Sequence, residues 1–216
     1  KECPSFPFLA LLVSGGHSQL IHVRAIGDYS IVGDTLDDAA GEAFDKTAQL
    51  LGLGYPGGLA LSNLAEKGGP FFTLPRPLLN SHRFNFSFSG LKTAVLTLVK
   101  KQKILNESIK ANIAFEFQEA ITDVLVKKSF LALEHLNLNQ LVVSGGVGAN
   151  KKLREKLTQI SSKNNFKVFF PAFEFCTDNG AMIALAGALR YHLSAKNDFK
   201  YTVKPRWRLS EIDSIS

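Results

Sequence analysis

Two Ser-Gly-Gly turns are the stretches of this sequence whose residue types best suit the binding of an anion. Ser14-Gly15-Gly16 follows the apolar run "FLALLV", and Ser144-Gly145-Gly146 follows "LVV". Glycine tolerates a positive φ and lets a ligand approach the backbone, so that several peptide N–H groups can point at one anion. A tight structural turn is the ordinary explanation for either stretch alone, but two such turns after buried-type strands favour a nucleotide site.

The chain is expected to take a different path after each of the two turns. The first returns along a strand and is therefore a hairpin tip, whereas the second runs through 147–150 into a helix. A helix N-terminus carries unpaired N–H donors and a partial positive charge, which suits a nucleotide.

Two carboxylates could complete such a site. Asp45 falls on a predicted helix over 37–51, beside Asp38 and Glu42, so it is either part of a solvated acidic face or a carboxylate that accepts hydrogen bonds from ribose hydroxyls. Asp178 begins the last predicted helix, where stabilising the helix dipole is its simplest role. As a metal ligand it has no partner in this sequence, since no two histidines lie four residues apart on a helix.

The motifs of several other enzyme classes are missing from the sequence. There is no Gly-Lys-Ser/Thr phosphate loop, no Gly-x-Ser-x-Gly turn and no His-Glu-x-x-His zinc motif, and neither Ser14 nor Ser144 has the His and Asp context of a nucleophile. Contact with RNA is an open alternative, because one segment mixes cations with phenylalanines, although phenylalanines are more often core. These residues are Phe71, Phe72, Arg76, Arg83, Phe84, Phe86, Phe88 and Lys92.

The composition is that of a folded, basic protein. The chain has 216 residues, 45% of them hydrophobic, and a formal net charge of +6, which fits one large domain or two small ones and permits a polyanionic partner such as RNA. No apolar run approaches the roughly 18 residues of a membrane span, and 6–13 is too short for a signal peptide, so no membrane contact is expected. Cys3 and Cys176 lack metal-type spacing and are expected to be reduced thiols in the cytoplasm.

Hydrophobic periodicity predicts an α/β fold with a mixed sheet. Three strands form an antiparallel meander, and helices then alternate with strands. The predicted strands cover 8–14, 19–24, 29–33, 140–143 and 167–170. The predicted helices cover 37–51, a short segment ending near Lys67, a segment from an N-cap at Ser89, 108–136, 147–160 and 177–193, while 70–85 is irregular. In the helix over 108–136, one side is predicted to carry Ile113, Phe117, Ile121, Val124 and Leu125.

Five motifs together resemble the TsaD family of threonylcarbamoyltransferases, formerly called glycoproteases. They are "LLVSGGHSQL", "DDAAGEAFDKTAQLLGLGYPGG", "FSFSGLKT", "SGGVGAN" and "CTDNGAMIA", in the order of the family, and the resemblance runs from Phe6 to the "KPRWRL" tail. It implies the actin-like ATPase fold (ASKHA, ribonuclease-H-like), a mixed sheet flanked by helices, with two lobes around a nucleotide cleft. Residues 6–175 would be the second lobe, and 176–216 the C-terminal helix and tail returning to a first lobe that is largely missing. The start at Lys1, without Met, likewise reads as the interior of a longer chain.

The resemblance also implies which residues bind ligands. No catalytic side chain is assigned, because the family is expected to act by positioning and electrostatics. One divalent metal ion, iron or zinc, would use Asp178, and its other ligands, a pair of histidines, would lie in the missing N-terminal part. The adenine nucleotide, threonylcarbamoyl-AMP, would contact Leu12, Val13, Ser14, Gly15, Gly16, Asp45, Gly58 and Asn150.

The implied function is transfer of the threonylcarbamoyl group from threonylcarbamoyl-adenylate to N6 of adenosine 37 of tRNAs reading ANN codons. The implied partners are tRNA, a paralogous actin-fold subunit (TsaB-like) and a small ATPase (TsaE-like). A sugar kinase or ATPase of the same fold and a non-catalytic nucleotide- and partner-binding lobe are the alternatives; a metalloprotease is disfavoured. This chain alone is expected to be inactive, and its last helix is expected to expose an Ala/Gly face.

Overall fold

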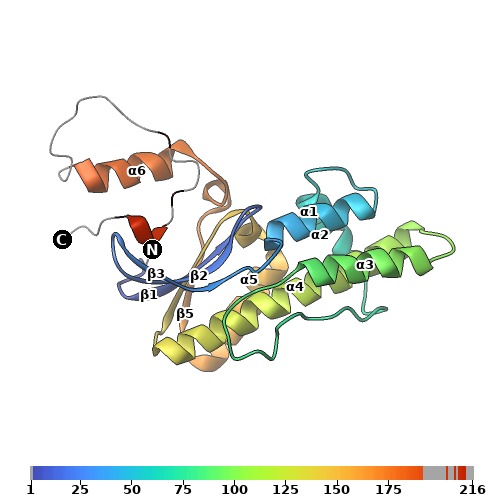
Figure 1. Cartoon of the computed structure of the whole chain (residues 1–216), viewed down its shortest axis with the longest axis horizontal. Helices are drawn as coiled ribbons and strands as arrows, with labels where there is room; N and C mark the ends of the chain where they lie inside the picture. Colours follow the sequence, from blue (N-terminus) through green and yellow to red (C-terminus); the bar gives the residue numbers. More distant parts are fainter. Residues whose placement is uncertain (1, 192–202, 204–206, 208, 213–216) are drawn as a thin grey trace.

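Five strands form a mixed sheet in the computed structural model, which describes residues 2–191, 203, 207 and 209–212 (Figure 1). The strands are β1 (Phe8–Val13), β2 (Ser18–Ala25), β3 (Asp28–Asp34), β4 (Gln140–Ser144) and β5 (Lys167–Phe169). The first three are antiparallel neighbours, while β4 pairs in parallel with both β1 and β5. The order β3-β2-β1-β4-β5 confirms the predicted meander and mixed sheet, and it makes β1 and β4 direct neighbours.

The helices follow the predicted alternation, but the helix predicted over 147–160 is a 3₁₀ turn followed by an α-helix that begins and ends four residues later than predicted. They are α1 (Ala40–Leu50), α2 (Gly58–Ala65), α3 (Ser89–Lys101), α4 (Glu107–Leu136), α5 (Lys151–Asn164) and α6 (Gly180–Arg190), with 3₁₀ turns at Gly146–Ala149, Phe173–Phe175 and Leu209–Glu211. Figure 1 shows α1, α2 and α3 on one side of the sheet and α6 apart from them on the other. The last predicted helix extends to 193, and its final two residues lie outside the described residues.

The core is centred on α4. Its predicted core residues Ile113, Phe117, Ile121, Val124 and Leu125 are all fully buried, so that prediction is confirmed. They pack in one cluster with the inward residues of β1, which alternate along the strand as a pleated sheet requires. The Phe117 ring also meets a ring of α1 edge-on, which fixes α1 against α4.

Helix α1 begins three residues later than its periodicity predicts, because Asp37 has another role. The Asp37 carboxylate accepts hydrogen bonds from the backbone N–H groups of Phe88 (2.7 Å) and Ser89 (3.1 Å), at the start of α3. The hydroxyls of Ser87 and Ser89 donate to it as well. Ser89 is therefore the first residue of α3 and not its N-cap, which is Phe88, and the capping acceptor comes from a distant part of the chain.

The segment that mixes phenylalanines with cations is mostly structural. Phe86 and Phe88 are fully buried and stacked on each other, so neither is accessible to RNA. Arg76 forms ion pairs with Glu116 and Asp123 on α4. Phe71 differs, since 74% of its surface is exposed. The core explanation is therefore right for the two central phenylalanines, and RNA contact elsewhere in the segment stays a prediction.

The C-terminal part is described only in places. Residues 192–202, 204–206, 208 and 213–216 lie outside the described residues, so the division of the chain at 175 and the return of the tail to a first lobe stay predictions. The 3₁₀ turn at Leu209–Glu211 lies against β3. In the described ranges no helix combines the length and hydropathy that a bilayer crossing needs, and neither cysteine forms a disulfide there.

We predict that Asp37→Ala lowers the free energy of unfolding by about 1–2 kcal/mol, since it leaves the first N–H groups of α3 without their acceptor. Burial opposes ionisation of Asp37, but the hydrogen bonds from Ser87, Phe88 and Ser89 outweigh it and lower the pKa of the carboxyl. The contribution of the charge is therefore fully present above the unfolded-state pKa of about 3.9 and lost as pH falls through the folded-state value.

Urea unfolding of the wild type, Asp37→Ala and Asp37→Asn at pH 7 and pH 3 measures both effects. Asp37→Asn keeps an acceptor oxygen and is expected to lie between the other two at pH 7. If the free energies of unfolding of the wild type and Asp37→Asn differ as much at pH 3 as at pH 7, the charge of Asp37 does not have the role assigned to it.

Candidate functional site

The two Ser-Gly-Gly turns lie side by side at one edge of the sheet. Leu12 of β1 is paired with Ser144 of β4 in the parallel register, so both strands end together. Gly145 has a φ of +94°, and a Cβ atom there would lie 2.2 Å from the carbonyl oxygen of Val13. The second turn therefore packs backbone against backbone on the first, an approach that glycine alone permits.

The first turn is held by its own serine. The Ser14 hydroxyl oxygen accepts hydrogen bonds from the N–H groups of Gly16 (3.2 Å) and His17 (3.0 Å), and the Ser14 N–H donates to the His17 carbonyl (2.8 Å). Gly15 and Gly16 do not have positive φ values, so that reason for glycine applies at Gly145 and not here. Glycine instead leaves open space here: among the described residues, apart from the chain neighbours, no atom lies within 4 Å of the position of a Cβ at either residue, and both are exposed. The N–H of Gly15 has no hydrogen-bond acceptor among the described residues.

Helix α1 docks its N-terminus onto this turn. The Gly41 N–H donates to the Ser14 carbonyl (3.1 Å), and the Ala40 N–H donates to the Ser18 hydroxyl (2.8 Å). A Cβ at Gly41 would lie 2.5 Å from the Ser14 carbonyl oxygen. The first N–H groups of α1 are therefore used to position the hairpin tip and are not available to an anion.

The second turn continues through a 3₁₀ turn to Asn150, which caps α5. The Asn150 side-chain oxygen accepts from the Leu153 N–H (2.9 Å), while its amide nitrogen donates to Ser62 on α2 (3.1 Å) and to Gln118 on α4 (2.8 Å). Both amide hydrogens and the oxygen are thus bound within the protein. Asn150 ties three helices together beside the turn, and its predicted contact with the adenylate stays a prediction.

Asp45 has a defined partner and is not on a purely solvated face. Its Oδ1 atom accepts from the N–H groups of Gly57 (2.9 Å) and Gly58 (2.8 Å), at the start of α2. A Cβ at Gly58 would stand 3.3 Å from this oxygen, which explains why glycine suits that position. Oδ2 has no hydrogen-bond partner among the residues that the structure describes, so it is available for a ribose hydroxyl.

Asp178 is exposed, and its segment lies close in space to the second turn. The neighbouring Thr177 methyl group would lie 3.9 Å from a Cβ at Gly146, which places this segment beside the turn. Asn179, and not Asp178, caps α6 through the Met182 N–H (3.0 Å). The described residues contain no group of three His, Cys, Asp or Glu that could hold a metal ion. Asp178 can supply one carboxylate to a metal, but these residues alone do not form a metal site.

The exposed face predicted for the last helix is present. None of the residues of α6 is buried, and large apolar side chains point into solvent along it. Met182, Ile183, Leu185 and Leu189 are between 46% and 69% exposed. Contiguous apolar surface of this kind marks a contact with another part of a protein or another chain.

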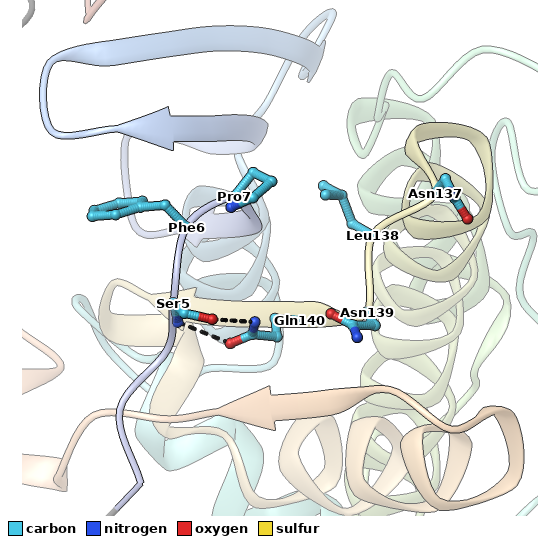
Figure 2. A pocket seen from close by; sticks show the side chains of 7 residues that line it. All are labelled: Ser5, Phe6, Pro7, Asn137, Leu138, Asn139 and Gln140. Atoms are coloured by element: carbon cyan, nitrogen blue, oxygen red, sulfur yellow. Dashed lines mark hydrogen bonds between the residues drawn. The ribbon is translucent and has the colours of Figure 1, made fainter.

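The surface hollow shown in Figure 2 is unrelated to the two turns. It lies where β1 and β4 begin, and the turns follow the opposite ends of these strands. Hydrogen bonds between Ser5 and Gln140 join the two segments there (Figure 2). The candidate site is instead an open edge of the sheet.

Three residues that shape this edge were not identified from the sequence. Ser18 accepts a hydrogen bond from the Ala40 N–H through its hydroxyl, and Gly41 contacts the Ser14 carbonyl through its backbone; no local sequence pattern predicts either contact between the hairpin and α1. Gln118 had a usable signal, because it is a polar residue among apolar neighbours on a buried helix face.

Comparison with known proteins identifies the same family as the motifs. A family model described as "TsaD: tRNA N6-adenosine threonylcarbamoyltransferase" matches residues 1–185. Proteins of that name from Methylobacillus flagellatus and Herminiimonas arsenicoxydans are 61% identical over 212 residues and 59% identical over 220 residues. These matches cover 97% and 100% of this chain but 62% and 64% of the relatives. The chain thus spans less than two thirds of their length.

We predict that Gly145→Ala lowers the free energy of unfolding by about 2 kcal/mol or more, because the new methyl group overlaps the Val13 carbonyl and alanine is strained at this φ. Gly15→Ala is the matched control in the first turn, where space is open and φ is ordinary, and its change should stay within about 0.5 kcal/mol. Urea unfolding of both variants tests the difference. Equal effects would show that the two turns are not packed as described.

Proposed function

This chain belongs to the TsaD family of tRNA N6-adenosine threonylcarbamoyltransferases, and from that premise we propose that the whole protein modifies tRNA. It transfers the threonylcarbamoyl group from threonylcarbamoyl-adenylate to N6 of adenosine 37 in tRNAs that read ANN codons. The α/β mixed sheet is consistent with the actin-like fold of the family. The observation that supports the proposal most directly is the juxtaposition of the two Ser-Gly-Gly turns at one edge of the sheet, because residues expected to contact the adenylate belong to or adjoin these turns.

The reaction requires positioning more than a protein nucleophile. The N6 amine attacks the carbamoyl carbonyl carbon, the bond from that carbon to the phosphate oxygen breaks, AMP leaves, and N6 loses a proton. Holding the two reactants in this geometry contributes much of such a rate enhancement. In this chain the open backbone at Gly15 and Gly16 lets the adenylate approach closely, and the Gly15 N–H donates to one of its oxygens.

Asp45 holds the nucleotide through its ribose in this proposal. Oδ1 remains bound to the start of α2, and Oδ2 accepts from a ribose hydroxyl. Leu12 and Val13 present backbone next to the turn, and Gly58 keeps the space beside Asp45 open. A divalent metal ion, iron or zinc, would gain Asp178 as one ligand, with the remaining ligands from outside the described residues, and would supply Lewis-acid stabilisation of negative charge.

The proposed partners are tRNA, a TsaB-like paralogous subunit and a TsaE-like ATPase, acting in the cytoplasm. By itself this chain would be a nucleotide- and partner-binding lobe. The uncovered face of α6 and the share of the relatives that the chain spans both support this view. Nothing in the described residues favours a sugar kinase over the transferase.

The first test is product formation. Full-length protein with its partner proteins, threonylcarbamoyl-adenylate and unmodified tRNA is expected to yield the modified nucleoside by mass spectrometry, whereas the 216-residue chain alone is expected to yield none. Absence of product with full-length protein and partners would refute the proposed reaction.

The second test concerns the charge of Asp45. Asp45→Asn keeps an acceptor for Gly57 and Gly58, so the melting temperature should change little, but it weakens the hydrogen bond to ribose and should reduce adenylate affinity roughly tenfold. Calorimetry on the full-length protein measures the affinity. Gln49→Ala, exposed on the same helix, is the control. If both variants bind like the wild type, Asp45 serves only to cap α2.

A further inference from the structure

We propose that Arg154 is a positioning residue that fixes the second Ser-Gly-Gly turn against the segment leading to Asp178 and places a positive charge behind the turn. The proposal rests on the proposed function of the two turns, but the contacts that carry it belong to Arg154 itself. Arg154 lies on the first turn of α5, among lysines from which no sequence pattern distinguishes it.

One set of contacts reaches the turn. The Arg154 Nε–H donates to the carbonyl oxygen of Gly148 at 2.7 Å. Gly148 in turn closes the 3₁₀ turn, since its N–H donates to the Gly145 carbonyl at 2.8 Å. The guanidinium therefore holds a residue that shapes the loop between β4 and α5.

A second set of contacts reaches the segment after β5. The Arg154 Nη2 group donates to the carbonyl oxygen of Pro171 (3.0 Å) and to the sulfur of Cys176 (3.4 Å). The guanidinium carbon also lies 4.2 Å from the ring centre of Phe173 and 4.9 Å from that of Phe170. Cys176 is buried and stands two residues before Asp178, so these contacts fix the approach to the exposed carboxylate.

Arginine is required for this arrangement. Its planar guanidinium donates in two directions at once and stacks on aromatic rings, whereas a lysine ammonium is a single point of charge. On the same helix, Lys152 and Lys156 form ion pairs with carboxylates of α4. Within the described part of the chain Arg154 has no carboxylate partner, so its charge is not neutralised and favours an anion at the adjacent turn.

The consequence is that the turn and the Asp178 segment are held as one unit. Without the guanidinium, the Gly148 and Pro171 carbonyls lose a shared donor, and the two segments can separate. Binding of the adenylate should suffer more than binding of tRNA, because the contacts of Arg154 converge on the nucleotide side of the site.

The test compares Arg154→Met with Lys156→Met in the full-length protein with its partners. Both changes remove a cation from α5, but Lys156 pairs with Glu119 and Asp123 and does not touch the turn. Arg154→Met is expected to raise KM for the adenylate roughly tenfold and leave KM for tRNA unchanged. Lys156→Met is expected to lower the melting temperature without changing either KM. Equal effects of the two variants, or an unchanged adenylate KM in Arg154→Met, would overturn the proposal.

Two further measurements separate this proposal from the proposed reaction. Hydrogen exchange of 146–150 and 171–178 is expected to accelerate in Arg154→Met and not in Lys156→Met, and this comparison holds even if the wild type forms no modified tRNA. Arg154→Lys keeps the charge but not the planar fork, so its exchange in both segments should lie between wild type and Arg154→Met. If both segments of Arg154→Lys exchange hydrogen at the wild-type rate, the geometry of the guanidinium is not needed.

Discussion

The parallel pairing of β1 with β4 is the constraint on which the candidate site depends. It brings two turns that lie 130 residues apart in the sequence to one edge of the sheet, with the Gly145 backbone against the Val13 carbonyl. A side chain at that contact would force the strands apart or twist the second turn away. Hydrogen bonds position the neighbouring helices at this edge. The first N–H groups of α1 donate to the hairpin, and Asn150 caps α5 directly after the second turn.

The polar groups at this edge hold the scaffold together, and Asp45 is also proposed to bind the ligand. Asp45 holds the start of α2 with one oxygen and leaves the other open, and Asn150 uses its whole amide to join α2, α4 and α5. Removing such a side chain entirely would change the scaffold and the site together. Isosteric changes that keep the acceptor or the shape are therefore the informative ones, because they separate the two roles.

Much of this arrangement follows from local pattern, and the remainder depends on contacts between distant segments. Alternating apolar residues predicted the meander, and helical spacing predicted the buried face of α4. The start of α1 was predicted too early, because periodicity does not reveal that Asp37 is used to cap α3 across 51 residues. The sequence pointed to both turns but not to the partners of Gln118 and Arg154. These are the Asn150 amide, 32 residues from Gln118, and the carbonyl groups of Gly148 and Pro171, 6 and 17 residues from Arg154.

The length of α4 gives the contact between Gln118 and Asn150 a mechanical meaning. A helix of 30 residues is about 45 Å long and resists bending, so it moves largely as a rod. Gln118 lies in the central part of this helix, and its side-chain oxygen accepts a hydrogen bond from Asn150 in the loop at the sheet edge. A displacement of either end of α4 therefore tilts or shifts Gln118 and, through it, Asn150. Binding at a distant point on the helix would change the position of this loop.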